Sequence, residues 1–267
     1  MKTYTRRDLT IISGVGWSQA TPTPATDLCS LGDKCLVIAC DSCGAVGAKK
    51  EDVLKLSTHY VAKFTLRVAL SEVMCSGAKP VTIINGVACE MKPTGEELIL
   101  GIREELENAN ISDIVLTGST EENFTTNMTA LAITVIGVAT EDELKFGQAA
   151  KGDKLVLLGS PSVGEEVDLE SKGFYTEIRQ LLLLSGVKEI VPVGSKGIAY
   201  EAEMLESMNS MVYRQFDYDS NDSMLIDFNK SAGPATCLLV LCAESSVNHV
   251  MDIYPKGLVV GEYVTNA

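Results

Sequence analysis

Three short stretches in the first half of the sequence combine carboxylates with glycine or hydroxyl side chains. The first is IACDSCGAVG at 38–47, in which Asp41 follows an apolar run and precedes a turn that contains Ser42, Gly44 and Gly47. A carboxylate at the end of a strand can bind Mg²⁺ while backbone N–H groups of the next turn face phosphate oxygens. The same residue pattern also occurs where an aspartate only caps a turn. This stretch alone is therefore consistent with either a Mg²⁺–phosphate site or a capped turn.

The second stretch is RVALSEVMCSGAKP at 67–80, which places Glu72 inside an apolar helical pattern. An unpaired carboxylate is costly to bury, so Glu72 must reach water, a cation or a partner such as Arg67. A metal ligand and a glutamate on a helix surface are both consistent with this pattern.

The third stretch is LTGSTEEN at 116–123. Gly118 is followed there by the hydroxyls of Ser119 and Thr120 and by the carboxylates of Glu121 and Glu122. Hard oxygen ligands beside hydrogen-bond donors suit a magnesium-bound phosphate. A polar loop with a helix-capping hydroxyl is the alternative. We expect all three stretches to meet around one divalent ion and a triphosphate.

Other site chemistries fit the sequence less well. It has no GxxxxGK[ST] loop, and GVG at 14–16 lacks the spacing of a dinucleotide fingerprint. The two histidines, His59 and His249, do not accompany a motif-like serine. Cys40 and Cys43 form a CxxC pair, which can be redox-active or half of a zinc site, but no second pair has zinc spacing. A thiol protein therefore remains as a separate class of function, in which both cysteines would be essential.

Charge and composition exclude several partners. The chain has 36 acidic and 22 basic residues and a formal net charge of −14. Nucleic acids and anionic membrane surfaces repel such a protein, so we expect neither as a partner. The apolar runs at 130–138 and 235–243 are too short to span a bilayer. With no signal-peptide pattern at the N-terminus and eight cysteines, we expect a cytoplasmic protein with reduced thiols.

The elements that must position these residues alternate along two halves of the chain. We expect an irregular, mobile segment over 1–28, a strand over 34–40, and a long helix over 51–76. A second helix over 94–108 would start at a capping box of Thr94 and Glu97. The other expected strands are 81–87, 113–116, 131–139, 154–158, 189–193, 236–242 and 257–264, and the other helices are 172–184 and 200–209. A polar stretch at 141–153 divides the chain into domains 1–148 and 149–267.

The order and spacing of these segments resemble one superfamily, which contains aminoimidazole ribonucleotide (AIR) synthetase, thiamine-monophosphate kinase, hydrogenase maturation protein E and selenophosphate synthetase. GDK at 32–34 with the 38–47 stretch resembles its first acidic motifs, and 67–81 resembles its ALSD helix with Glu72 in place of aspartate. The 114–123 stretch resembles its GGDT loop. KGDKLVLLGS at 151–160 and KSAGPATCLLV at 230–240 resemble motifs of its second domain.

The resemblance implies a two-domain α/β fold of α+β type, called PurM-like, whose N-terminal sheet domains form a homodimer. It also implies ATP and Mg²⁺ as cofactors and a small-molecule acceptor. The expected metal ligands are Asp41, Glu72, Glu121 and Glu122. The expected nucleotide contacts are Asp33, Ser42, Gly44, Gly47, Gly118, Ser119 and Thr120. Asp41, Arg67 and Lys34 are the expected catalytic residues, with Arg6 or Arg7 assisting if the N-terminal segment closes.

Within the superfamily, the 67–80 and 117–123 stretches most resemble α-ribazole kinase, which phosphorylates a nucleoside used in cobalamin salvage. The sequence departs from the family at Ser119, where an acid is usual, at Lys34, and in its short second domain. We therefore expect a kinase that phosphorylates a riboside 5′-hydroxyl. The alternatives are a synthetase of the same superfamily that activates an amide or carbonyl oxygen, and a nucleotide-binding regulatory protein without catalysis.

Overall fold

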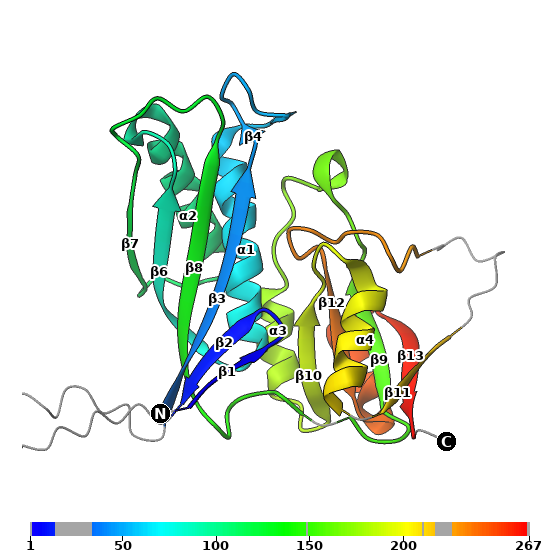
Figure 1. Ribbon diagram of the computed structural model, residues 1–267. Coiled ribbons are helices and arrows are strands. Elements are labelled where there is room, and N and C mark those ends of the chain that lie inside the picture. Colours follow the sequence, from blue (N-terminus) through cyan, green and yellow to red (C-terminus); the bar gives the residue numbers. More distant parts are fainter. Residues whose placement is uncertain (1, 14–33, 148, 210, 217–225, 266–267) are drawn as a thin grey trace, which may run out of the picture.

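The structure is a computed structural model that describes residues 2–13, 34–147, 149–209, 211–216 and 226–265. It has two mixed halves, each built on its own sheet (Figure 1). This arrangement confirms the predicted α/β fold class of α+β type. Among the described helices, none is long and apolar enough to cross a membrane.

The N-terminal half contains a six-stranded sheet in the order β1-β2-β3-β8-β6-β7. Neighbouring strands are antiparallel except β6 and β7, which are parallel. The strands are β1 (Lys2–Arg6), β2 (Leu9–Ser13), β3 (Lys34–Gly44), β6 (Lys79–Val87), β7 (Val115–Ser119) and β8 (Ala130–Thr140), and a small pair is formed by β4 (Val46–Gly47) and β5 (Leu54–Lys55). Every second residue of β8 is buried, so one face of the sheet carries the core.

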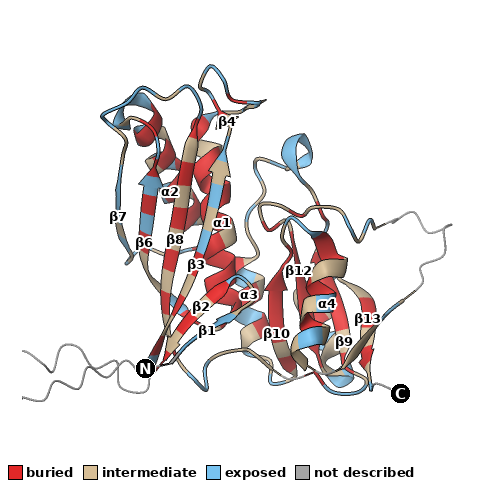
Figure 2. Ribbon diagram, in the orientation of Figure 1, coloured by how far each residue is buried: buried red, intermediate tan, exposed pale blue. Residues whose placement is uncertain are grey.

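Helix α1 (Thr58–Cys75) lies between the two halves and is buried along most of its length (Figure 2). It packs on β3 and β8, and also on β10 and α3 of the C-terminal half. Because it is covered on several sides, its buried residues include the charged side chains of Lys63, Arg67 and Glu72 as well as apolar ones. Helix α2 (Glu96–Asn108) crosses α1 at Gly101, where a Cβ would lie 1.8 Å from the backbone oxygen of His59.

The C-terminal half contains a five-stranded antiparallel sheet in the order β10-β12-β9-β13-β11. Helix α4 packs on one face, and α3 and α5 pack on the other. The strands are β9 (Lys154–Gly159), β10 (Val187–Pro192), β11 (Val212–Gln215), β12 (Cys237–Cys242) and β13 (Leu258–Val264), and the helices are α3 (Tyr175–Leu182), α4 (Gly197–Asn209) and α5 (Val247–Ile253). Short helical turns occur at η2 (Met91–Gly95), η3 (Gly164–Glu166) and η4 (Glu244–Ser246).

Several local predictions differ from the structure. Residues 2–13 form the β1–β2 hairpin rather than irregular chain, because Leu9 and Ile11 alternate into the core; residues 14–28 lie outside the described part. Helix α1 begins at Thr58 rather than near residue 51. The predicted capping box is wrong, because the Thr94 hydroxyl donates to the side chain of Glu90 instead of capping α2.

The two halves share one cluster of buried apolar side chains. This cluster joins residues of β3, β8 and α1 to residues of β10, β12 and α3. The proposed division into domains 1–148 and 149–267 falls at a residue outside the described part, and it stays a prediction.

Candidate functional site

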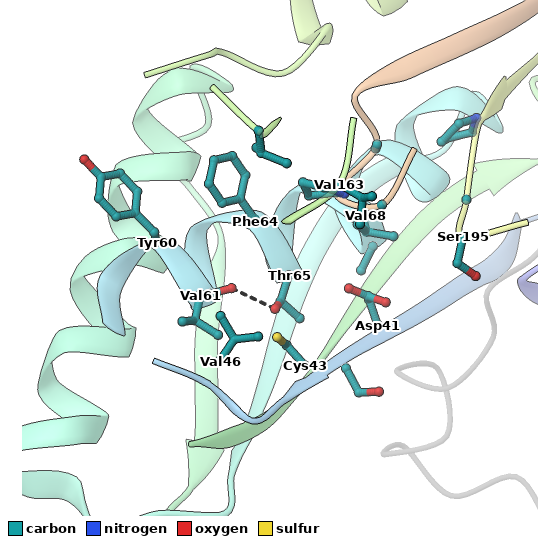
Figure 3. A pocket seen from close by; sticks show the side chains of 18 of the residues that line it. Asp41, Cys43, Val46, Tyr60, Val61, Phe64, Thr65, Val68, Val163 and Ser195 are labelled. Atoms are coloured by element: carbon teal, nitrogen blue, oxygen red, sulfur yellow. Dashed lines mark hydrogen bonds between the residues drawn. The ribbon is translucent and has the colours of Figure 1, made fainter. Parts of the chain in front are cut away.

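A cleft of about 640 Å³ lies between the two halves (Figure 3). Its walls come from the hairpin tip, the end of β3, one face of α1, the loop around η3, the end of β10 and the loop before β12. The lining residues that bear carboxylates or hydroxyls are Asp8, Asp41, Ser42, Tyr60, Thr65, Glu72 and Ser195. The structure therefore brings together residues from both halves of the sequence.

Asp41 lies on β3 and faces α1. Strand residues alternate between faces, so Asp41 shares a face with the buried residues Val37 and Ala39. Figure 3 shows its carboxylate directed into the cleft. Burial, together with the nearby carboxylate of Asp8, raises the pKa of Asp41 to about 6, although the backbone N–H of Ser42 opposes this. Among the described residues, no ion pair with a basic side chain is formed by this carboxylate.

Glu72 is the second carboxylate at this end of the cleft, and it is 5% exposed. Burial raises the pKa of Glu72 to about 7, and the carboxylates of Asp8, Glu201 and Asp41 add to the effect. Only the guanidinium of Arg7 opposes this rise. Among the described residues, Glu72 Oε2 makes no hydrogen bond, and its one charged neighbour within 4 Å there is the guanidinium of Arg7, at 3.5 Å.

Arg7 stands at the tip of the β1–β2 hairpin with a positive φ of 52°. Its side chain is 2% exposed and lies between the two halves, 3.5 Å from Glu72 Oε2 and 3.6 Å from Glu189 Oε1. The neighbouring Arg6 donates two hydrogen bonds to Glu189, at 3.3 and 2.7 Å. The hairpin therefore fastens α1 to β10 and supplies a cation behind the acidic end of the cleft. The sequence predicts irregular chain at these positions, and it indicates a role for Arg6 or Arg7 only if the N-terminal segment closes over the site.

Arg67 does not reach the cleft. Residues 67 and 72 are five positions apart on α1, which turns their side chains about 140° away from each other. Arg67 instead forms a bidentate pair with Glu105, with Nε at 2.6 Å from Oε1, and Tyr175 also donates to that oxygen at 2.6 Å. It further contacts the hydroxyl and the backbone oxygen of Ser171. The geometry gives Arg67 a role in joining α1, α2 and the C-terminal half rather than in catalysis.

The loop that follows β7 lies away from the cleft. Strand β7 is separated from β3 by β8 and β6, which is about 14 Å across three strand spacings. Glu121 accepts backbone hydrogen bonds from Asn123 and Phe124, and Glu122 accepts one from Met91 and one from the Thr120 hydroxyl. The structure thus does not bring Gly118, Ser119, Thr120, Glu121 and Glu122 to Asp41 within one chain.

The other residues that were predicted to contact the nucleotide do not all lie at the cleft. Ser42 lines the cleft, and a Cβ on Gly44 would meet nothing within 4 Å. Gly47 has a structural reason to be glycine, because a Cβ there would lie 2.4 Å from Thr129 Oγ1. Lys34 is exposed at the opposite end of β3, about 23 Å from Asp41 along the strand, and Asp33 lies outside the described residues.

The CxxC pair does not form a joint site. Cys40 and Cys43 both lie on β3, and residues three apart on a strand point to opposite faces. Their Cα atoms are about 10 Å apart, which exceeds the span of a disulfide. Within the described part of the chain, no group of three or more His, Cys, Asp or Glu side chains is close enough to hold a metal ion unaided.

Comparisons with known proteins agree with this architecture. Residues 26–139 match the family described as AIR synthase related protein, N-terminal domain. No curated protein matches the sequence significantly. Among solved structures, the chain resembles T. maritima PurL complexed with AMPPCP (TM-score 0.62, 14% identity, covering 88% of this chain and 41% of that chain).

It also resembles an E. coli hydrogenase maturation protein, HypE (TM-score 0.64, 14% identity, covering 86% of this chain and 80% of that chain). A HypE structure in complex with ATP has a TM-score of 0.63 at 13% identity, covering 86% of this chain and 77% of that chain. The chain spans about two fifths of the length of the PurL chains. These likenesses confirm the predicted PurM-like fold.

Proposed function

Because residues 26–139 match the N-terminal domain of AIR synthase related proteins and the chain has the PurM-like fold, we propose that it binds ATP with Mg²⁺ and transfers the γ-phosphate to a hydroxyl of a small molecule. The observation that carries this proposal is the meeting of Asp41 and Glu72. They come from two separate acidic stretches and line the same end of one cleft.

The residues present fit a magnesium ion. Mg²⁺ in nucleotide sites is usually held by one or two carboxylates, while phosphate oxygens and water complete its shell. Asp41 and Glu72 supply two carboxylates at the cleft, and Oε2 of Glu72 makes no hydrogen bond to a described residue, although Arg7 lies 3.5 Å from it. The pair alone is too small a donor set to hold the ion without phosphate, which agrees with the lack of a three-ligand cluster in the described residues. When bound, the ion would neutralise charge on the transferring phosphate.

The chain's own residues would bind and orient the reactants. Phosphoryl transfer requires in-line positioning and charge neutralisation more than covalent help. In this reaction the acceptor oxygen bonds to the γ-phosphorus, the bond from that phosphorus to the bridging oxygen breaks, and ADP leaves. The hydroxyl proton is released to water. Ser42 follows Asp41 on β3 and also lines the cleft, where its hydroxyl can contact a phosphate.

For the acceptor we propose α-ribazole, phosphorylated on its 5′-hydroxyl. The resemblance of the 67–80 and 117–123 stretches to α-ribazole kinase supports this choice. The apolar part of the cleft wall, which includes Phe64 and Val68, is suited to a benzimidazole ring. A superfamily synthetase would differ in its product, because it would yield an aminated or cyclised compound instead of a phosphorylated riboside.

A second candidate is nucleotide binding without catalysis. Ser119 stands where the family has an acid, and its loop lies three strands away from Asp41 within one chain. A protein of this kind would bind ATP and Mg²⁺ without transferring phosphate to any riboside.

We also propose a homodimer through the N-terminal sheet. Helices α1 and α2 cover one face of this sheet, while its other face presents side chains that are partly exposed. Apolar residues on that face include Leu36, Ile38, Ile84, Ile136 and Val138. A partly exposed apolar face of this kind is typical of a surface that associates. Sedimentation that gives a monomer at all concentrations would contradict this part.

The transfer assay supplies the main test. Radiolabelled ATP is incubated with Mg²⁺ and α-ribazole, and the product is separated from ATP. We expect a phosphorylated riboside with the natural protein, loss of product with Asp41→Asn, and retention with Glu121→Gln, because Glu121 caps its own loop. Full activity of Asp41→Asn would remove Asp41 from the site.

A further inference from the structure

The charges that line the cleft all have the same sign. Asp8, Asp41 and Glu72 line it, and among the described lining residues there is no lysine, arginine or histidine. The nearest guanidinium, that of Arg7, is 2% exposed and is directed at Glu72 and Glu189. The cleft is therefore an anionic cavity whose neighbouring cation is turned away from it.

The segments outside the described residues contain no basic side chain that could neutralise the negative charge of the cleft. Residues 14–33, 148, 210, 217–225, 266 and 267 contain no lysine, arginine or histidine. Of all the basic side chains in the sequence, only that of Lys2 lies outside the described set. Lys2 pairs with Ser13 at the far end of the hairpin from Arg7 and Asp8.

The face of α1 that carries Glu72 continues away from the acidic end as an apolar and partly aromatic wall. Tyr60 and Phe64 are one turn apart on α1, and their rings stack with centroids 6.3 Å apart and an interplanar angle of 19°. Figure 3 shows Val68 one further turn along and Val163 across the cleft. Val167 and Leu169 extend this second wall. The two walls leave a slot with apolar sides and an acidic end formed by Asp8, Asp41 and Glu72.

We infer that the acceptor of this cleft is a molecule without a phosphate or carboxylate of its own, uncharged or cationic, with a flat apolar group and a free hydroxyl. The inference rests on the proposed function for the reaction, but its ground is the charge and shape of the cleft. In the protein without Mg²⁺, an anionic group on the acceptor would lie near three carboxylates with no basic side chain among the described lining residues, which disfavours binding. A flat apolar group would displace water from the slot between α1 and the η3 loop.

Matched pairs of compounds test the inference by binding alone, without ATP or Mg²⁺. The probes are benzimidazole riboside and its 5′-phosphate, and thiamine and thiamine monophosphate. Their dissociation constants for the full-length protein are measured by ligand-observed NMR in EDTA at pH 7.5. We expect the unphosphorylated member of at least one pair to bind at least tenfold more tightly than its phosphate.

Charge-reversal variants show whether the preference comes from the cleft. Asp8→Lys changes an exposed residue at the hairpin tip and should reduce the tenfold ratio to threefold or less. Asp252→Lys makes the same charge change at an exposed position of α5 that does not line the cleft, and it should leave the ratio unchanged.

The inference is overturned if a phosphate binds as tightly as its parent compound or more tightly, if neither pair binds below 5 mM, or if Asp252→Lys acts like Asp8→Lys. If only the proposed function is wrong, the preference for the unphosphorylated compound persists in the binding test, but no phosphate is transferred from ATP in the transfer assay.

Discussion

Replacing Glu72 with glutamine should stabilise the protein at alkaline pH while weakening its response to magnesium. Burial raises the pKa of Glu72 from its ordinary value of 4.5 to about 7. Between these two pH values the folded protein binds a proton that the unfolded chain does not bind. The free energy of unfolding is therefore highest below pH 4.5 and falls as the pH rises through 7, when the buried carboxylate becomes charged.

The size of the effect follows from the two pKa values. The interval from 4.5 to 7 corresponds to about 3 kcal/mol of unfolding free energy, lost by the natural protein above pH 7. Glutamine has nearly the same shape and no charge, so Glu72→Gln should avoid this loss. Arg7 would keep Glu189 as its partner, at 3.6 Å, so the substitution does not leave a buried guanidinium alone.

The assay is urea unfolding followed by circular dichroism, with EDTA present, at pH 5 and at pH 8.5. Glu72→Gln should match the natural protein at pH 5 within about 1 kcal/mol and exceed it by about 3 kcal/mol at pH 8.5. In thermal unfolding at pH 8.5 the gain corresponds to roughly 6–12 °C. Glu203→Gln, at an exposed position of α4, serves as the control and should leave both values unchanged.

A variant that is less stable than the natural protein at both pH values, or a difference that does not vary with pH, would refute the reasoning. Either result would mean that Glu72 is well solvated or fully neutralised by Arg7 in the folded protein. The same samples with Mg²⁺ and ATP in place of EDTA should show ligand stabilisation of the natural protein and little of Glu72→Gln.

Three further predictions concern residues outside the acidic end of the cleft. Glu105→Gln or Arg67→Met should lower the unfolding free energy by about 3–5 kcal/mol in denaturant titrations, because each leaves one buried partner unpaired; a loss below 1 kcal/mol would contradict this role. Gly101→Ala should destabilise the protein by at least about 2 kcal/mol, since its Cβ would lie 1.8 Å from a backbone oxygen of α1, and an unchanged melting temperature would disprove the close crossing. The Cys40→Ser and Cys43→Ser variants should retain ATP-dependent transfer within about twofold, and loss of transfer in both would favour a thiol mechanism.

The fold class and the resemblance to the superfamily could be predicted because the motifs can be recognised by their residue types and by their order along the sequence. Asp41 and Glu72 reach one cleft because each sits on an element with clear periodicity, a strand and a helix. The position of the 118–122 loop could not be read in the same way. It depends on the insertion of β8 and β6 between β3 and β7, and strand order leaves no local trace in the sequence.

The surroundings of three charged residues could not be predicted from the sequence for a related reason. The partner of Arg67 is Glu105, 38 positions away, and no local spacing indicates which carboxylate on α2 faces α1. Arg7 and Asp8 lie in a hairpin turn, whose short polar sequence resembles loose chain. Long-range contacts decide both cases, so only the folded structure shows that Arg67 pairs with Glu105 away from the cleft and that Arg7 lies behind its acidic end.

Calorimetric titration of a non-hydrolysable ATP analogue tests the central claim most directly. The natural protein, Asp41→Asn and Glu121→Gln are each titrated with Mg²⁺ and again with EDTA. The account predicts binding by the natural protein that requires Mg²⁺, at least tenfold weaker binding by Asp41→Asn, and unchanged binding by Glu121→Gln. Binding that is indifferent to Mg²⁺, or equal in the natural protein and Asp41→Asn, would contradict it.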